Sequence, residues 1–316
     1  MKLWLTRPLP QAVEARATAA FDVDIRPSND PLSPDELRRA LRDYDIVMPT
    51  LGDRFQADVF ADVPKPRCKL LANFGVGYNH IDVEAAQAHG VAVSNTPGAV
   101  TDATADIAMT LILMTARRAG EGERMVRAGQ WAGWHPTQML GLHVTGRTLG
   151  VIGMGRIGQA IARRCHFGFG MDVRYVARSE KDLEFPAVRD TDMESLAAHS
   201  DIVVVAVPGG AETHHLIDAA VFAAMRAHAV FVNIARGDVV DEAALIAALQ
   251  GGAFAGAGLD VYEFEPKVPD ALIAMENVTL LPHLGTAALN VRTDMGMMVM
   301  DNVQAFAEGR DLPNAV

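Results

Sequence analysis

Three ionisable side chains each follow an apolar, strand-like run of the sequence. They are Arg236, Glu265 and His283. A guanidinium can hold a carboxylate and polarise a carbonyl, and a protonated imidazole can give its proton to the carbonyl oxygen while a hydride reaches the carbon. A carboxylate beside the imidazole stabilises its protonated form. Together these groups could reduce a 2-oxo acid. Each residue taken singly is more often structural, so this hypothesis depends on their meeting beside a cofactor site.

A glycine-rich segment supplies that cofactor site. Gly153, Gly155 and Gly158 form a GxGxxG pattern that closes an apolar run and opens a helical one. The first glycine permits the turn, the second lets a pyrophosphate approach the main chain, and the third lets helix and strand pack closely. Free N–H groups at the helix start favour the diphosphate charge. A tight turn without a ligand is the alternative, and the flanking strand and helix make it the weaker one.

The end of the next apolar run discriminates between the two nicotinamide cofactors. NAD sites usually carry an acidic residue there, whereas this sequence has Ala177, followed by Arg178 and Ser179. Without a carboxylate a 2′-phosphate is not repelled, and Arg178 can pair with it. We therefore predict NADP as the preferred cofactor, with NAD as a possible one. The alternative is that Arg178 is only a solvated loop residue.

Short apolar runs alternate with helical patterns along the whole chain. The first series occupies residues 2–6, 23–27, 45–50, 69–75 and 91–95, and the second occupies residues 148–153, 172–177, 201–208, 229–235, 257–262 and 278–282. Runs that are apolar on both faces are typical of parallel strands covered by helices. One helix start is explicit, because Ser33, Pro34 and Glu36 make a capping box. The pattern predicts an α/β protein with two doubly wound parallel sheets.

The domain boundaries follow from two long helical segments. Residues 96–118 begin with a Pro-Gly pair and lead into the second series of strands, and the last helix, 290–310, returns to the first. We predict a Rossmann cofactor domain (99–285) inserted in a flavodoxin-like substrate domain (1–98 and 286–316). The ligand site is expected between the two domains.

Composition excludes several classes of protein. The 316 residues carry a net charge of −11, which argues against nucleic-acid binding. Cys68 and Cys165 lie far apart and form no CxxC pair, so the sequence has no disulfide framework, which suits a reducing compartment. The apolar stretch 107–116 is too short to span a bilayer, and the N-terminus does not read as a signal peptide. We expect a cytoplasmic protein that binds neither nucleic acid nor membrane.

Five motifs together resemble those of the D-isomer-specific 2-hydroxyacid dehydrogenases, most closely the glyoxylate/hydroxypyruvate reductase branch. The motifs are "NFGVGYNHID" (73–82), "GVIGMGRIGQAIA" (150–162), "VNIARGDVVDEAAL" (232–245), "GAGLDVYEFEP" (256–266) and "LLPHLGTA" (280–287). The resemblance covers essentially the whole chain. It is specific for the family and less so for the substrate.

The resemblance implies a role for each catalytic and substrate-binding residue. Arg236 would bind the substrate carboxylate and keto oxygen, His283 would be the acid/base, and Glu265 would pair with it. The loop of Gly75, Val76 and Gly77 would hold the substrate carboxylate through its N–H groups. A small 2-oxo or 2-hydroxy acid is thus the expected partner.

The same resemblance implies further cofactor contacts and a homodimer. Arg156 and Ile157 would lie at the pyrophosphate, and Asp260 near the nicotinamide amide. The other residues expected to line the cofactor are Pro208, Thr213 and Ile234. The long helix after Pro97 and an arm (130–141) would build the dimer interface, with Trp134 reaching the partner's active site.

Other histidines are given structural roles. His214 and His215 are adjacent, so we expect their side chains to diverge, and no metal site is predicted. His80 is expected to stabilise a turn near the substrate loop.

These observations favour NADPH-dependent reduction of glyoxylate or hydroxypyruvate, with a histidine as proton donor. An NAD-linked dehydrogenase of another D-2-hydroxy acid is the nearer alternative. A dinucleotide-sensing, corepressor-like binding protein is the more distant one, and the complete set of Arg236, Glu265 and His283 argues against it.

Overall fold

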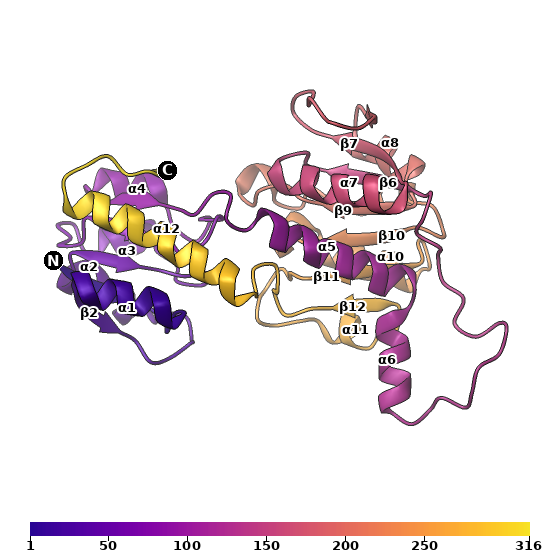
Figure 1. Ribbon diagram of the computed structural model, residues 1–316, viewed down its shortest axis with the longest axis horizontal. Coiled ribbons are helices and arrows are strands. Elements are labelled where there is room, and N and C mark those ends of the chain that lie inside the picture. The colour runs from indigo at the N-terminus through magenta and orange to yellow at the C-terminus, as the bar shows by residue number, and fades with distance from the viewer. The chain divides into compact units, whose positions relative to one another are not determined.

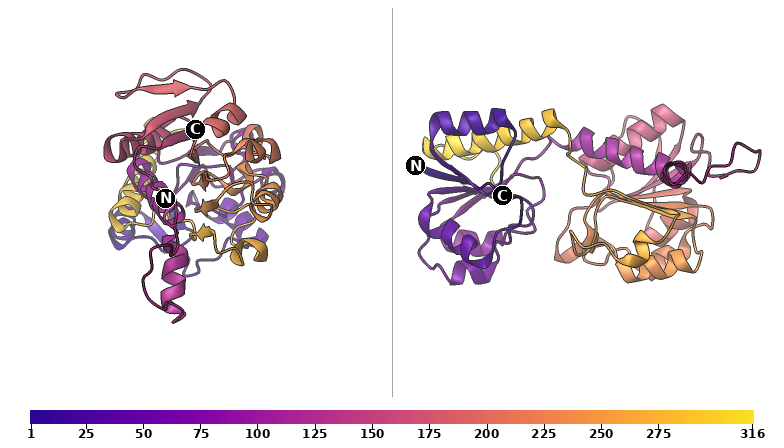
Figure 2. Two further views of the ribbon diagram at one scale, coloured as in Figure 1. Left: turned by 90° about the vertical axis from the view of Figure 1, so that its right-hand side faces the viewer. Right: turned by 90° about the horizontal axis from the view of Figure 1, so that it is seen from below.

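The computed structural model describes residues 1–316, which divide into two compact units (Figure 1). Unit 1 comprises Met1–Val100 and Ala287–Val316, and unit 2 comprises Thr101–Thr286. Each unit is a parallel sheet with helices on both faces, as the further views show (Figure 2). The prediction of two doubly wound parallel-sheet domains is therefore confirmed.

Unit 1 contains a five-stranded sheet in the order β2-β1-β3-β4-β5. Its strands are β1 Lys2–Leu5, β2 Asp22–Ile25, β3 Ile46–Met48, β4 Leu70–Ala72 and β5 Ala92–Ser94. Its helices are α1 Gln11–Ala20, α2 Pro34–Asp43, α3 Ala57–Ala61, α4 Val83–Ala88 and α12 Leu289–Ala307. All the pairings are parallel, and this strand order is that of flavodoxin-like folds.

Side chains along each strand of unit 1 alternate between two apolar layers. Leu3 and Leu5 pack in a cluster with Val13 of α1 and Val299 of α12, whereas Trp4 packs in the cluster on the other face. Alternation is what a strand imposes, because successive Cβ atoms point to opposite faces. The last helix of the chain thus packs on the first sheet, as the sequence predicts.

The predicted capping box at the start of α2 is present. The Ser33 side chain accepts the Glu36 N–H, and the Glu36 carboxylate accepts the Ser33 N–H at 2.9 Å. Pro34 occupies the first turn, where its missing N–H leaves no partner unsatisfied.

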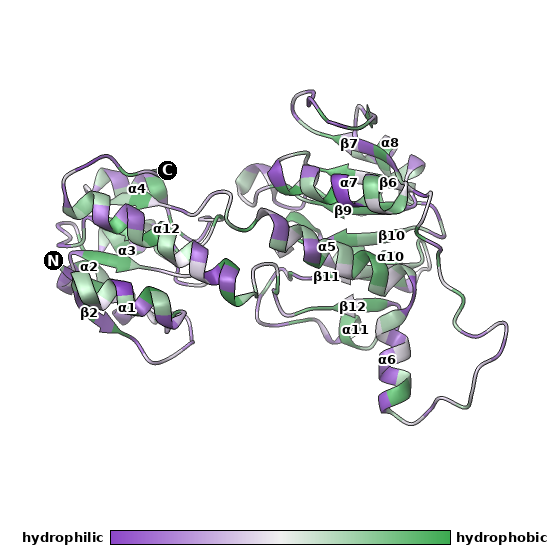
Figure 3. Cartoon of the chain, viewed as in Figure 1, coloured by the Kyte–Doolittle hydropathy of each residue, from purple (hydrophilic) through white to green (hydrophobic).

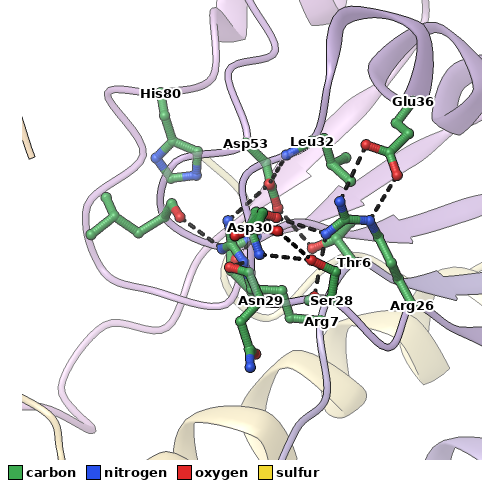
Figure 4. Close-up of polar contacts among 12 residues, drawn as sticks. Thr6, Arg7, Arg26, Ser28, Asn29, Asp30, Leu32, Glu36, Asp53 and His80 are labelled. Atoms are coloured by element: carbon green, nitrogen blue, oxygen red, sulfur yellow. Dashed lines mark hydrogen bonds and ion pairs between the residues drawn. The ribbon is translucent and has the colours of Figure 1, made fainter. Parts of the chain in front are cut away.

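A buried carboxylate, Asp53, ties the loops at the carboxyl ends of β1 and β3 together (Figure 4). One oxygen accepts from the Thr6 hydroxyl (2.7 Å) and the Thr50 N–H (2.9 Å). The other accepts from the Leu32 N–H (3.1 Å) and from Arg7 Nη2 (3.2 Å). Each oxygen therefore has at least two protein donors, so this charge is paired within the fold.

Unit 2 contains a seven-stranded sheet in the order β12-β11-β10-β9-β6-β7-β8. Its strands are β6 Thr148–Ile152, β7 Asp172–Val176, β8 Ala187–Arg189, β9 Ile202–Val205, β10 Val230–Asn233, β11 Gly256–Leu259 and β12 Val278–Leu280. All pairings are parallel, and β6, the first strand of the unit in the chain, lies inside the sheet between β9 and β7. This is the Rossmann arrangement with one further strand.

The helices of unit 2 cover its sheet on both faces. They are α5 Thr101–Ala116, α6 Ala119–Arg127, α7 Arg156–Phe169, α8 Met193–His199, α9 Ala219–Ala224, α10 Glu242–Gln250 and α11 Asp270–Ile273, with the 3-10 turns η1 Ala211–Thr213 and η2 Gly237–Val239. In β9, Ile202 and Val204 join the layer under α5 and α7, whereas Val203 and Val205 join the layer with α8, α9 and α10. The strands are correspondingly apolar (Figure 3). None of the helices combines the length and apolar character that crossing a bilayer requires.

One strand is missing from the sequence prediction. β8 lies at the edge of the sheet, beside β7, and pairs with it over three residues. Its side chains are half-buried or exposed and include Arg189, so it has no apolar run to reveal it. β8 therefore forms because it pairs with β7, and not because of an apolar pattern of its own.

Candidate active site

The carboxyl ends of β10, β11 and β12 carry the three predicted catalytic side chains to one edge of the unit 2 sheet. These strands are parallel neighbours (Figure 1). Arg236 follows β10, Glu265 follows β11, and His283 follows β12. Ligands of open α/β sheets bind at this edge, because the loops that follow the strands converge there.

The main chain around Arg236 is held by the buried amide of Asn233. Its nitrogen donates to the Arg236 carbonyl (2.9 Å), and its oxygen accepts the N–H two residues along the chain (3.0 Å). Gly237 has no space for a side chain, since a Cβ there would lie 1.8 Å from the Tyr262 carbonyl carbon. The turn that carries Arg236 therefore packs directly on the main chain that leads to Glu265.

The Arg236 guanidinium is half-buried and short of partners. Its Nη1 donates to the Ala235 carbonyl at 2.6 Å, whereas its buried Nε has no hydrogen-bond partner. Burial lowers the pKa of Arg236, and the charges of Glu265 and Asp238 oppose that shift only in part. An unpaired buried donor is costly, so an anionic ligand would complete this site.

His283 and Glu265 form a hydrogen-bonded pair. Nδ1 of His283 lies 2.8 Å from one oxygen of Glu265, and the other oxygen accepts the Tyr262 N–H at 3.1 Å. An ionised carboxylate only accepts, so Nδ1 carries the proton and Nε2 is left to face a substrate. Burial raises the pKa of Glu265, but the hydrogen bond and charge of His283 outweigh it, and the net shift is downward.

Asp260 uses both of its carboxylate oxygens within the protein. One accepts the Leu284 N–H (2.6 Å) and the other the Gly285 N–H (2.8 Å), while its main-chain carbonyl accepts the His283 N–H (2.9 Å). Burial raises the pKa of Asp260, and the two N–H donors offset part of that rise. His283 has φ 54°, which is unfavourable for a residue with a side chain. Asp260 thus holds the turn that orients the His283 ring, and its predicted contact with the nicotinamide amide stays a prediction.

The glycine loop between β6 and α7 fits a dinucleotide diphosphate. Gly153 has φ +100°, and a Cβ there would lie 2.7 Å from a main-chain oxygen. A Cβ on Gly158 would lie 2.1 Å from the Gly153 oxygen, whereas the Cβ position of Gly155 is open. Helix α7 starts at Arg156 with no side-chain cap, so the first N–H groups, at Arg156 and Ile157, are available to an anion.

The loop after β7 is basic and exposed. The side chain of Arg178 is 91 % exposed, and the nearest carboxylate is Glu212, at 3.8 Å. The Ser179 hydroxyl accepts from Lys181 Nζ at 2.9 Å. Arg189 of β8 donates to two carbonyls of the loop at 3.0 and 3.3 Å. Glu212 and Arg189 come from other elements, which is why the sequence prediction does not include them.

The remaining predicted cofactor residues lie on loops at the same edge of the sheet. The Thr213 hydroxyl donates to the Pro208 carbonyl (2.8 Å), which closes the loop after β9. Ile234 directly follows β10 and is buried. Trp134 stands on the segment after α6 and is 79 % exposed, and its role in a partner's active site stays a prediction.

The prediction that the side chains of His214 and His215 diverge is wrong. The rings of His214 and His215 stack, with centroids 4.0 Å apart, because His215 takes up φ 49°. Nε2 of His215 lies 2.9 Å from Glu263, and atoms of the three side chains able to ligate a metal lie within 4.8 Å of one another.

One hollow of unit 2 lies apart from the candidate catalytic residues. It has a volume of about 500 Å³ and is lined by Thr115, Leu142, Val230, Asn277 and neighbouring residues. Val230 and Asn277 stand at the amino ends of strands, whereas Arg236, Glu265 and His283 follow the carboxyl ends. Chemistry and position therefore favour the carboxyl edge as the active site.

The predicted substrate loop lies in unit 1, beyond the carboxyl end of β4. The N–H groups of Val76 and Gly77 have no hydrogen-bond partner in the structure, whereas the Gly75 N–H is bonded to the Asn73 carbonyl. Two consecutive open N–H groups can bind an anion.

Comparisons with known proteins agree with this geometry. The family model of the D-isomer specific 2-hydroxyacid dehydrogenase, NAD binding domain, matches residues 109–285. A glyoxylate reductase of Thermococcus kodakarensis is 42 % identical, over 100 % of this chain and 96 % of the relative. A glycerate dehydrogenase of Hyphomicrobium methylovorum is 36 % identical, over 100 % and 98 %.

A solved structure is similar over the same extent. The NADPH-dependent glyoxylate/hydroxypyruvate reductase of Sinorhizobium meliloti, in complex with NADP and malonate, superposes with a TM-score of 0.87. It is 34 % identical, over 100 % of this chain and 96 % of that one. The chain therefore belongs to the D-isomer specific 2-hydroxyacid dehydrogenases, in the glyoxylate reductase branch, and is an NAD(P)-dependent oxidoreductase.

Proposed function

We propose that the protein reduces a small 2-oxo acid, glyoxylate or hydroxypyruvate, with NADPH, and that His283 donates the proton. One observation carries the proposal: His283 is bonded through Nδ1 to Glu265 at 2.8 Å, and its Nε2 has no partner. An imidazole held this way can take up a second proton on Nε2, the nitrogen that faces outward, and then donate it. The names of the relatives, glyoxylate reductase and glycerate dehydrogenase, support the substrate class.

Arg236 and His283 act on different atoms of the substrate, and Glu265 acts through His283. Arg236 binds the carboxylate and polarises the keto group, which its unpaired Nε and open guanidinium edge support. Protonated His283 gives the Nε2 proton to the keto oxygen, and Glu265 stabilises the imidazolium before transfer. A bound nicotinamide dinucleotide supplies the hydride. The loop of Gly75, Val76 and Gly77 donates N–H groups to the substrate carboxylate.

The proposed preference for NADPH rests on the loop after β7. It holds no carboxylate at Ala177, it carries Arg178 and Lys181, and Arg189 of β8 donates to two of its carbonyls. These cations suit a 2′-phosphate. The Sinorhizobium meliloti relative is named as NADPH-dependent, which supports the same choice.

The proposal includes a homodimer and a cytoplasmic location. Exposed apolar side chains, Trp131, Trp134 and Leu140, lie on the segment after α6, as expected of a surface that a second copy covers. Cys68 and Cys165 are free and buried, which suits a reducing compartment.

The test is a panel of 2-oxo acids assayed with NADPH and NADH. We expect glyoxylate and hydroxypyruvate to be reduced, with the higher kcat/KM for NADPH. The Arg178→Ala variant should lose NADPH activity selectively, and an equal loss with NADH would refute the role of Arg178. A protein that binds NADPH and reduces no member of the panel would instead be a dinucleotide sensor.

A further inference from the structure

All three carbonyl oxygens of the loop 75–77 are held by side-chain amides of unit 1. Nδ2 of the fully buried Asn73 donates to the first and third carbonyls, at 3.0 and 3.1 Å. Nδ2 of Asn95 donates to the middle carbonyl, at 2.9 Å. The first carbonyl also accepts the main-chain N–H of Thr96 at 3.1 Å. Every oxygen of the loop is thus anchored to the protein.

Anchored carbonyls determine where the N–H groups of the loop point. In a trans peptide the C=O of one residue and the N–H of the next point in opposite directions. The bonds to the first two carbonyls therefore direct the N–H groups of Val76 and Gly77 away from Asn73 and Asn95. Neither N–H has a partner in the structure. Two donors held side by side in this way suit a carboxylate.

His80 sets the orientation of the Asn73 amide. Its Nε2 lies 3.0 Å from the Asn73 oxygen. Both N–H hydrogens of the Asn73 amide point to carbonyls, so its oxygen must be the acceptor and Nε2 of His80 the donor. An inverted amide would place oxygen against two carbonyl oxygens. His80 is buried, so this bond forms away from water, and it makes the inverted arrangement unfavourable.

We propose that Asn73 and Asn95, with His80 behind Asn73, are positioning residues for recognition of the substrate carboxylate. They touch no substrate, and they act by holding two N–H groups of the loop in the direction of the anion. This inference rests on the proposed function, because it takes the loop as the carboxylate site. It adds three residues whose effect falls on KM for the 2-oxo acid, because they position donors that bind the carboxylate and leave proton transfer to His283 unchanged.

The test compares Asn73→Asp with a matched control, Asn302→Asp. Asn302 is also a fully buried asparagine of unit 1 whose Nδ2 donates to a carbonyl, that of Met298, at 2.9 Å. In Asn73→Asp we expect KM for glyoxylate to rise about tenfold or more, as loss of charge-assisted donors implies. KM for NADPH and kcat should change little. Asn302→Asp should lower Tm without changing KM for glyoxylate.

A second pair of variants covers the case in which Asn73→Asp fails to fold. His80→Ala should raise KM for glyoxylate by roughly twofold to tenfold, as loss of one hydrogen bond implies. His80→Gln, which retains an N–H donor, should restore most of that loss. Unchanged KM in folded Asn73→Asp and in His80→Ala, or an equal rise in Asn302→Asp, would overturn the inference.

Calorimetric titration with oxalate separates this inference from the proposed function. Oxalate binding reports on carboxylate recognition without turnover. Wild-type protein that reduces no 2-oxo acid refutes the proposed function. Equal oxalate affinity in wild type and in His80→Ala, or no oxalate binding by the wild type, refutes the role of Asn73 and His80.

Discussion

Two charged side chains, Asp53 in unit 1 and Arg236 in unit 2, are satisfied to very different extents. Asp53 is fully buried, and each of its oxygens accepts at least two hydrogen bonds, from Thr6, Thr50, Leu32 and Arg7 (Figure 4). Arg236 donates to one main-chain carbonyl and keeps a buried Nε without a partner.

The difference separates a structural charge from a functional one. A buried charge whose hydrogen bonds are complete is compensated within the fold and offers nothing to a ligand. A partly buried charge with open donors is unfavourable in the unliganded protein and becomes satisfied when an anion binds. Asp53 should therefore matter to stability and Arg236 to activity, and five predictions test this contrast.

The largest effect is expected at His283. In His283→Ala, kcat for the 2-oxo acid should fall by about 10²- to 10⁴-fold, since the proton donor is lost. The fold should tolerate the change, because the ring is partly exposed. Steady-state kinetics and a thermal melt measure both quantities. Undiminished turnover would remove His283 from the mechanism.

Arg236→Lys comes next. Lysine keeps the charge and loses the rigid fork, so kcat/KM should fall about tenfold to hundredfold, the range for a lost charge-assisted hydrogen bond. Stability should hold or rise, because the unpaired Nε is removed. A large drop in Tm with normal kinetics in the folded fraction would place Arg236 in the same class as Asp53.

Asp53→Asn tests the structural side of the contrast. We expect a loss of about 1–3 kcal/mol in the free energy of unfolding, because the amide nitrogen cannot accept the bonds that the carboxylate accepts. Urea denaturation measures this loss. Assays well below Tm should give a kcat within about twofold of wild type, as for a change outside the catalytic trio. Lost activity in fully folded Asp53→Asn would contradict a purely structural role.

Glu265 should make the free energy of unfolding depend on pH, in a direction that its pKa determines. Burial acts to raise the pKa of Glu265. The hydrogen bond from His283 and the charge of that ring outweigh burial, so the pKa in the folded protein is lowered from 4.5. A lowered pKa contributes stability that is present above pH 4.5 and is lost as pH falls through the folded pKa. The difference in unfolding free energy between wild type and Glu265→Gln should therefore shrink below pH 4.5. A difference that stays constant from pH 7 to pH 3 would show that ionised Glu265 contributes no such stability.

The smallest effect is expected at the cofactor loop. Glu212 lies 3.8 Å from Arg178, and both side chains are about nine-tenths exposed. Replacing this acid in Glu212→Gln should raise the ratio of kcat/KM for NADPH over NADH by about twofold to fivefold, the range of an exposed charge pair. The effect should fade in high salt. Glu180→Gln, a change at an acid of the same loop for which no ion pair with Arg178 is seen, serves as the control.

Much of the fold was predictable because its signals are local. The apolar runs, the capping box at Ser33 and the glycine loop each depend on residues close together in the chain. Edge strand β8 was not predictable, because its three residues carry no apolar pattern and become a strand only by pairing with β7. Likewise, the stacking of the His214 and His215 rings cannot be predicted from the fact that the two residues are adjacent in the sequence.

The sequence by itself determined the residue types at the strand ends: a guanidinium, a carboxylate and an imidazole beyond three apolar runs. Only the tertiary structure decided how they are held. Asp260 reaches Leu284 across 24 positions of the chain, and Asn95 reaches Val76 across 19. Periodicity is a property of neighbours in sequence, whereas these bonds depend on which strands become neighbours in the sheet. The residues that orient the site therefore became visible only once the chain was folded.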